Sequence, residues 1–206
     1  VYSHLVWKPV WERWNLGLGW MPIEKFEYDN SRNRCYEIRA NWALYVDNYL
    51  EGFHIPFVHN DLNRTLDYDD YRTEIFDGGV LQIGIARDGE PSFEIPEESP
   101  DFGLEVAAYY YWIYPGLMLN FYPWGLSVNL VLPLSVDRTR IEYYGFVWDK
   151  KFLGKGAGGD LDKVEEEDQF VVESTHRGVS SVSYERGRYS PSKEIGVHHF
   201  HQMISS

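Results

Sequence analysis

Short apolar or alternating segments dominate the middle of the chain. YRTEIF, VLQIGIA and EVAAYYYWIY lie within residues 69–114, and LMLNFYP, LSVNLVLPL and RIEYYGFVW follow them. Proline, glycine or aspartate bounds the later segments, which is typical of an antiparallel meander. Residues 24–40 alternate as well, on both sides of the turn signal DNSRN, and this predicts a further pair of strands. We therefore predict a sheet of six to eight strands.

Two other segments have helical patterns. Apolar residues recur at helical spacing from Trp42 to Phe53, and Pro56 then interrupts the pattern. The segment LDKVEEEDQFVVESTHRGV, from Leu161, has acids near its start, where they favour the helix dipole, and Gly178 as a stop. This order of elements predicts an α+β fold with helices gathered on one side of an antiparallel sheet. A ligand cavity is expected between the sheet and the long helix.

The ends and connectors carry less information. Residues 1–24 are rich in tryptophan and tyrosine and are expected to form a peripheral helix and loop that pack onto a larger body. GKGAGGD at residues 154–160 lacks the G-K-[ST] ending of a phosphate loop, so we interpret it as a flexible connector. A chain of 206 residues fits one domain, which we place over residues 1–206.

Charge and apolar run length exclude several classes of partner. The formal net charge is -13, and such a surface repels phosphate backbones and anionic headgroups. Nucleic acid and membrane are therefore not expected as partners. No apolar run reaches the roughly 20 residues that a spanning helix needs, and no signal-peptide pattern opens the sequence. These features favour a cytoplasmic protein.

The candidate chemistry lies in NWALYVDNYLEGFHIPFVHNDL, residues 41–62, where ionisable side chains alternate with aromatic and aliphatic ones. On an unbroken helix His54 and His59 would lie about 140° apart, too far for one small ion. Pro56 ends or kinks the helix between them, so the two imidazoles can converge from two short elements.

Two imidazoles and one carboxylate form the face that leaves positions on Fe(II) open for oxygen and substrate. Asp47, Glu51 and Asp61 are carboxylate candidates close in the sequence, and Asp168 is a distant one. Asp168 lies one turn before two valines and on the inward side of its helix. The three glutamates that precede it are expected to be solvated: Glu165, Glu166 and Glu167.

Other conspicuous side chains have simpler interpretations. His198, His199 and His201 are expected to pack or to lie on the surface, because a terminal helix or strand would split them between faces. His176 is expected at a helix end. Asp47 either orients a ligating histidine or is a solvated helix acid. The aromatic run at residues 109–112 is expected in the core, with alternate rings facing a cavity; such rings could also cage a quaternary ammonium ion.

Two motifs carry a resemblance to a known family. Residues 41–59 match N-W-x4-[DE]-N-x2-[DE]-x2-H-x4-H, and residues 167–178 match E-D-x2-[VL]-x-E-x3-R-G. Both resemble the mononuclear-iron motifs of the catalytic domain in Rieske-type ring-hydroxylating oxygenase large subunits. The closing segment GRYSPSKEIGVHHFHQMI is similar as well. The resemblance covers roughly residue 25 to the end. It implies a helix-grip fold of the START/Bet v 1 type, with a curved antiparallel sheet, a long C-terminal helix and flanking helices.

Residue by residue, the resemblance implies that His54, His59 and Asp168 are the Fe(II) ligands. Glu51 matches the acid that links an iron-ligating histidine to a Rieske cluster on the neighbouring subunit of a homotrimer. Asn48 matches an asparagine close to the iron. Glutamate at the bridging position is similar to the choline and carnitine type of monooxygenase.

The sequence departs from the family in its cysteines. Cys35 is the single cysteine, so these 206 residues cannot hold a Rieske [2Fe-2S] cluster with its two cysteine ligands. The cluster is then on another chain, belongs to a removed domain, or is not used because the domain binds metal without turnover.

The prediction is a non-haem Fe(II) oxygenase domain that hydroxylates a small aromatic or quaternary-ammonium substrate. It would use O2 and electrons from an external Rieske centre and reductase. One alternative is a catalytically silent helix-grip module that binds a small molecule. Another is a hydrolase with Zn(II) on the same ligands, which the absence of H-E-x-x-H disfavours.

Overall fold

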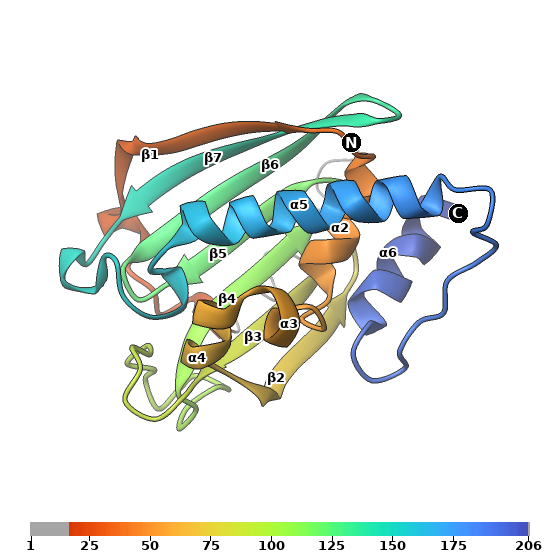
Figure 1. Cartoon of the computed structure of the whole chain (residues 1–206). Helices are drawn as coiled ribbons and strands as arrows, with labels where there is room; N and C mark the ends of the chain where they lie inside the picture. The colour runs from red at the N-terminus through yellow and green to blue at the C-terminus, as the bar shows by residue number, and fades with distance from the viewer. Residues whose placement is uncertain (1–16, 206) are drawn as a thin grey trace, which may run out of the picture.

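The computed structural model describes residues 17–205 of the chain. Seven antiparallel strands form one sheet in the order β1-β7-β6-β5-β4-β3-β2 (Figure 1). The predicted number of strands is therefore confirmed. The strands are β1 (Glu27–Ile38), β2 (Leu66–Phe76), β3 (Gly79–Ala86), β4 (Val106–Ile113), β5 (Leu117–Tyr122), β6 (Gly125–Ser135) and β7 (Arg138–Val147). From β2 to β7 each strand pairs with the next one in the sequence, and β1 closes the order beside β7.

The predicted strand pair at residues 24–40 is wrong, because DNSRN lies inside the single strand β1. Asp29 pairs with Gly145 and Arg34 with Tyr143, so five positions along β1 correspond to two along β7. The Asp29 carboxylate accepts hydrogen bonds from the backbone N–H and the hydroxyl of Ser31. Asp29 thus provides a hydrogen-bond acceptor for the backbone N–H of Ser31 within a bulge, and the strand continues without reversing.

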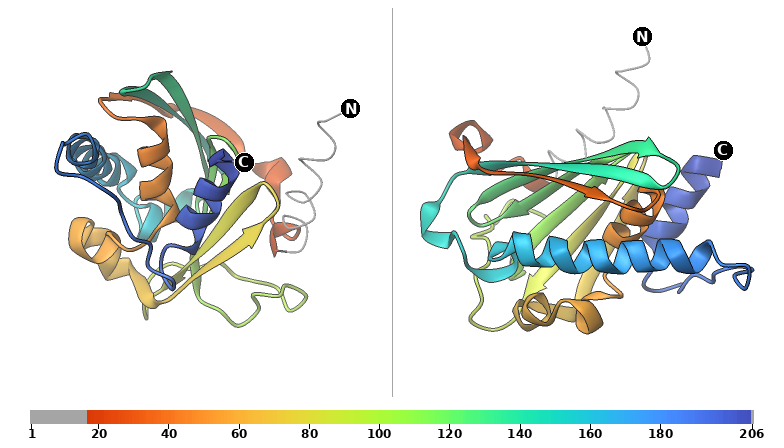
Figure 2. Two further views of the ribbon diagram at one scale, coloured as in Figure 1. Left: turned by 90° about the vertical axis from the view of Figure 1, so that its right-hand side faces the viewer. Right: turned by 45° about the horizontal axis from the view of Figure 1, so that its top comes forward.

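The helices lie on one face of the sheet, as predicted (Figures 1 and 2). Helix α5 is the long helix, and it starts where the Asp160 side chain accepts a hydrogen bond from the Lys163 backbone N–H. It ends one residue beyond the expected stop at Gly178. The helices are α2 (Trp42–Leu50), α3 (Ile55–Val58), α4 (Asn60–Thr65), α5 (Leu161–Val179) and α6 (Ile195–Ser205), with 3-10 turns η1 (Ile23–Lys25), η2 (Lys150–Phe152) and η3 (Gly156–Gly158).

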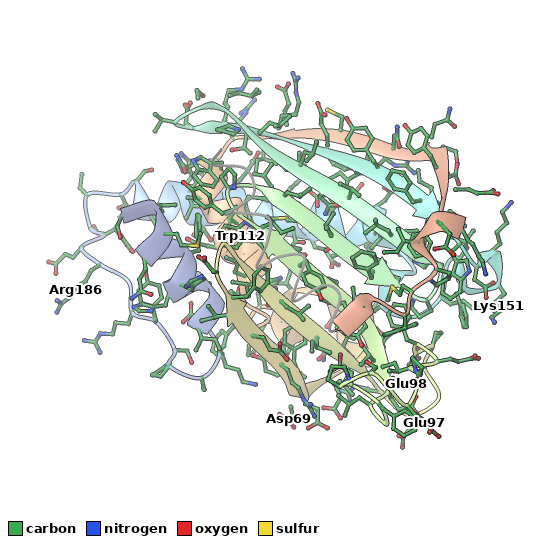
Figure 3. The ribbon with its side chains drawn as sticks, turned by 180° about the vertical axis from the view of Figure 1, so that it is seen from behind. Asp69, Glu97, Glu98, Trp112, Lys151 and Arg186 are labelled. Carbon is green, nitrogen blue, oxygen red and sulfur yellow. The ribbon has the colours of Figure 1, made fainter. Side chains whose placement is uncertain are left out.

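Strand alternation places the aromatic residues of β4 in different cores. On β4, Trp112 belongs to the core under the helices, whereas Tyr109 and Tyr111 belong to the core on the opposite face. Tyr110 lines a pocket on the helix side, so the prediction of alternate rings facing a cavity is confirmed. In the view from behind, the sheet lies in front of the helices and Trp112 is labelled on the side of the sheet nearer α6 (Figure 3).

Two peripheral segments complete the molecule. Of the expected segment 1–24, residues 1–16 lie outside the described part, and Leu18 is buried in the core on the side of the sheet away from the helices. Residues 156–158 are packed and not a flexible connector. The Gly158 carbonyl accepts a hydrogen bond from Trp124 Nε1 at 3.1 Å, and a Cβ on Gly158 would come within 2.4 Å of that nitrogen. Only glycine allows this close approach.

In residues 17–205 we find no helix with the length and apolar character required to cross a bilayer.

Candidate metal centre

Helix α2 and two short helices place both motif histidines. α2 ends at Leu50, three residues before the predicted Phe53, because the backbone becomes extended at Glu51. Pro56 lies in the first turn of α3, where its missing N–H costs no hydrogen bond. It therefore begins a new helix as well as interrupting the old pattern. His54 precedes α3, and His59 lies between α3 and α4.

The fold brings the two imidazoles and Asp168 together. His54 Nε2 lies 3.0 Å from His59 Nε2, and Asp168 Oδ1 lies 3.0 Å from His59 Nε2 and 3.4 Å from His54 Nε2. Metal bonds of about 2.1 Å meeting at about 90° separate ligand atoms by about 3 Å, so these distances suit a transition metal ion. Among residues 17–205, these three are the one group of at least three histidine, cysteine or acidic residues with such spacing.

The outer nitrogen of each ring is held by a carboxylate. His54 Nδ1 lies 2.6 Å from Glu51 Oε1, and His59 Nδ1 lies 2.7 Å from Glu167 Oε2. A ring that donates Nδ1–H to a carboxylate directs the lone pair of Nε2 at the opposite side, which is the arrangement of metal-binding histidines. Asn48 Nδ2 donates a hydrogen bond of 2.7 Å to Asp168 Oδ1. Asn48 is thus next to the centre, as the resemblance implies.

Without a metal these groups stabilise one another as ions. Burial lowers the pKa of His54, but hydrogen bonds with Asp168 and Glu51 outweigh it and raise that pKa to about 9. Burial raises the pKa of Asp168, and the hydrogen bonds from both histidines more than reverse this and bring it to about 2. The metal-free centre at neutral pH therefore carries a proton on His54 and an ionised Asp168.

Metal affinity is expected to rise with pH. Below about pH 9 a metal ion must displace the His54 proton, so each displaced proton gives about a tenfold gain in apparent affinity per pH unit. Competition with a chelator between pH 6 and 8, corrected for protonation of the chelator, measures this slope with Co(II) or Zn(II). An affinity that stays constant over this range would contradict the ion pair at the centre.

The expectation that the three glutamates before Asp168 are solvated is confirmed only for Glu166. Glu165 is buried and binds the hydroxyls of Tyr45 and Tyr143, and Glu167 contacts His59. Helical spacing could have predicted that Glu165 is buried. It precedes Asp168 by three residues and the buried Val172 by seven, so all three lie on one face of α5.

Replacing Glu167 by alanine is expected to weaken metal binding about 10- to 100-fold, because His59 loses the carboxylate that orients its ring. The matched control is Glu166→Ala, one position earlier on the same helix and exposed. Equilibrium titration with Co(II) measures both variants. Equal affinities in the two would show that Glu167 does not hold the ring.

The other acidic candidates and histidines have different partners. Asp61 forms ion pairs with Arg64 and Lys163, away from the two rings. Asp47 neither orients a motif histidine nor is solvated: its carboxylate lies 2.8 Å from His201 Nε2 on α6. His201 therefore ties α6 to α2, in agreement with the packing interpretation of the C-terminal histidines. His176 is in the last turn of α5, as predicted.

A pocket adjoins the three-residue centre, between the sheet and α5, as predicted. It contains about 740 Å³ of space free of protein atoms, part of which is open to solvent. Six tyrosines and five neutral polar side chains contribute to its wall: Tyr45, Tyr49, Tyr71, Tyr110, Tyr122, Tyr143, Asn48, Gln82, Asn120, Ser127 and Asn129.

Known proteins are similar to this chain in sequence and in fold. Residues 19–206 match the family model of the ring hydroxylating alpha subunit, catalytic domain. The chain is 35% identical over 180 residues to chloroplastic choline monooxygenase of Arabidopsis thaliana, covering 83% of this chain and 40% of that protein. It is 29% identical over 178 residues to the carnitine monooxygenase oxygenase subunit of Escherichia coli (strain K12), covering 81% of this chain and 46% of that protein.

Solved structures are similar in fold. A quaternary ammonium Rieske monooxygenase in complex with an inhibitor superposes with a TM-score of 0.71 at 23% identity, covering 94% of this chain and 52% of that one. Naphthalene 1,2-dioxygenase from Rhodococcus sp. bound to indole superposes with a TM-score of 0.60 at 16% identity, covering 84% of this chain and 54% of that one. They support the expected helix-grip architecture.

The chain spans less than half of the length of the two relatives named above. Within that span the family model covers nearly every residue, including both motifs that build the centre. The chain therefore belongs to the ring-hydroxylating oxygenase alpha subunit family and corresponds to its catalytic domain.

Proposed function

We propose that this chain is the catalytic domain of a Rieske-type non-haem iron oxygenase that hydroxylates a small organic substrate. The observation that carries the proposal is the convergence of His54 Nε2, His59 Nε2 and Asp168 Oδ1 within 3.4 Å at the wall of a pocket. A quaternary ammonium substrate is favoured over an aromatic one, because similar sequences act on choline and carnitine by name.

The protein's part in the reaction is to hold the metal ion, to orient its ligands and to shield the substrate from water. An Fe(II) ion bound by the three side chains would supply the chemistry that activates O2. Glu51 and Glu167 fix the two rings, and Asn48 fixes Asp168 by its hydrogen bond. The tyrosine-lined pocket would hold the substrate beside the centre and exclude water, which protects reactive species from side reactions.

Glu51 is the proposed entry point for electrons. Besides bonding His54, it lines both the internal pocket and a second hollow bordered by α2, α5 and the segment before α6. This position connects a ring of the centre with the outer surface. Residues 1–206 contain one cysteine, so the Rieske centre would be held by residues beyond these, on another domain or chain. A homotrimer with the donor centre on the neighbouring subunit fits this arrangement.

Metal analysis separates the oxygenase from its rivals. After anaerobic Fe(II) loading and desalting, the oxygenase proposal expects about one equivalent of iron per chain. Less than about a tenth of an equivalent would favour a metal-free ligand-binding module. Activity with Zn(II) and without O2 would favour a hydrolase. With iron bound, a Rieske donor, a reductase and O2 should convert choline or carnitine to an oxidised product.

A further inference from the structure

We propose that Glu165 is the counter-charge that recognises the cationic head of the substrate, which makes it a specificity-determining residue. The inference rests on the proposed function and deepens it, because it names the side chain that selects a cation. Glu165 lies on α5, and its side chain lines the pocket beside the three-residue centre. Only 6% of the residue is exposed.

The first argument is that, among residues 17–205, no cationic side chain is paired with this buried carboxylate. Its neighbours are hydroxyls and an amide: Tyr45 donates a hydrogen bond of 2.8 Å to Oε2, Tyr143 donates to the same oxygen, and Gln169 Nε2 lies 3.5 Å from Oε1. Burying a carboxylate without an opposite charge lowers the stability of the fold, whereas an apolar side chain at this position would add to the core packing. A cationic ligand would supply the missing charge.

The second argument is the composition of the pocket wall. Among the described residues that line the wall there is no lysine or arginine, while three are acidic: Glu51, Glu165 and Asp168. Glu51 and Asp168 are occupied by the histidines, so Glu165 remains to attract a positive ligand. Tyrosine rings fill much of the remaining wall, and their faces favour cations. A quaternary ammonium group donates no strong hydrogen bond, so ring faces and one charge suit it.

The third argument is the spacing along α5. Glu165 and Asp168 are three positions apart, and such residues have Cβ atoms about 5–6 Å apart on one helix face. A cationic head at Glu165 would therefore bring an attached chain of two or three carbons to the three donor atoms. Recognition and reaction would occupy adjacent positions on a single helix.

The charge state of Glu165 offers an additional readout. Burial and the charge of Asp168 raise its pKa to about 8, against the lowering by the tyrosine hydroxyls. A cation that binds beside it favours the ionised form, so binding near neutral pH should release a proton. The groups that face Glu165 from the surrounding elements are Tyr36 on β1, Tyr45 on α2, Tyr143 on β7 and Asp168 and Gln169 on α5, with the Arg34–Asp162 pair beyond Tyr36.

The test compares choline with its uncharged carbon isostere, 3,3-dimethyl-1-butanol, by calorimetry on the full chain. Wild-type protein is expected to bind choline at least about tenfold more tightly than the isostere. Glu165→Gln should remove this preference by weakening choline alone, since glutamine keeps the shape and can still accept from the tyrosine hydroxyls. It should also remove the proton release that wild type shows in buffers of different ionisation enthalpy.

Two controls separate charge from structure. Glu166→Gln removes an exposed charge one residue away and should leave both ligands unaffected. Tyr143→Phe removes a hydrogen bond to Glu165 but keeps the charge, and should retain most of the preference for choline. Thermal unfolding of Glu165→Gln verifies that the variant is folded.

Equal choline affinity in wild type and Glu165→Gln overturns the inference, as does equal weakening of choline and the isostere, or no choline binding by wild type. Iron loading by wild type is measured separately. If wild type does not load iron, the proposed oxygenase function is wrong. The binding comparison is done on metal-free protein, so it still decides the role of Glu165.

Discussion

Replacing Asp168 by alanine is expected to abolish stable metal binding, with a loss of affinity beyond about 100-fold. The variant removes one of three donor atoms and the charge that balances a divalent ion. It also removes the hydrogen-bond acceptor shared by Asn48 and His59. Iron content after anaerobic loading and desalting measures the effect, and any oxygenase activity should disappear with the iron.

The control for this variant is Asp61→Ala. Asp61 follows the second motif histidine closely in the sequence, but it forms exposed ion pairs with Arg64 and Lys163. Its loss should leave iron content unchanged. If Asp168→Ala retained iron as wild type does, or if Asp61→Ala lost it, the assignment of the carboxylate ligand would be wrong.

Replacing Trp112 by alanine is expected to lower the free energy of unfolding by about 3–5 kcal/mol. The indole is fully buried on β4 and makes an edge contact with Phe200 of α6 at 5.2 Å between ring centroids. Its removal leaves a cavity where α6 packs on the sheet. Urea denaturation of the metal-free protein measures the change, provided that the m-values of wild type and variant agree.

Phe170→Ala is the matched aromatic deletion at the surface. Phe170 lies on α5 and is 72% exposed, so its loss should change stability by no more than about 0.5 kcal/mol. A cost below about 1 kcal/mol for Trp112→Ala would show that the helix-side core can close around the missing ring.

Much of the fold follows from local pattern. The strand patterns predict a sheet of six to eight strands, and the structure has seven, whose alternate residues reach cores on opposite faces. Helical periodicity predicts α5 to within one or two residues at either end. The bulge in β1 is not predictable in the same way, because the turn residues of DNSRN satisfy their backbone groups equally well in a hairpin or in a strand.

The candidate site is only partly predictable. Pro56 indicates that His54 and His59 can converge, but sequence spacing alone left four possible carboxylates. Asp168 is 109 residues from His59, and only the tertiary structure, in which α5 packs beside α2, brings its carboxylate to the two rings. The family motif identified it without that geometry. Glu167 was missed because its charged head reaches a ring from a partly exposed position, which no apolar periodicity marks.

Helix α5 positions three acidic side chains with different partners: Glu165 on two tyrosines, Glu167 on His59 and Asp168 at both rings. A helix advances about 100° and 1.5 Å per residue, so one residue inserted after the Asp160 cap would displace all three at once. Single substitutions, in contrast, change one partner at a time. Protein engineering of substrate scope should therefore vary the side chain at position 165 and leave the length of this segment intact.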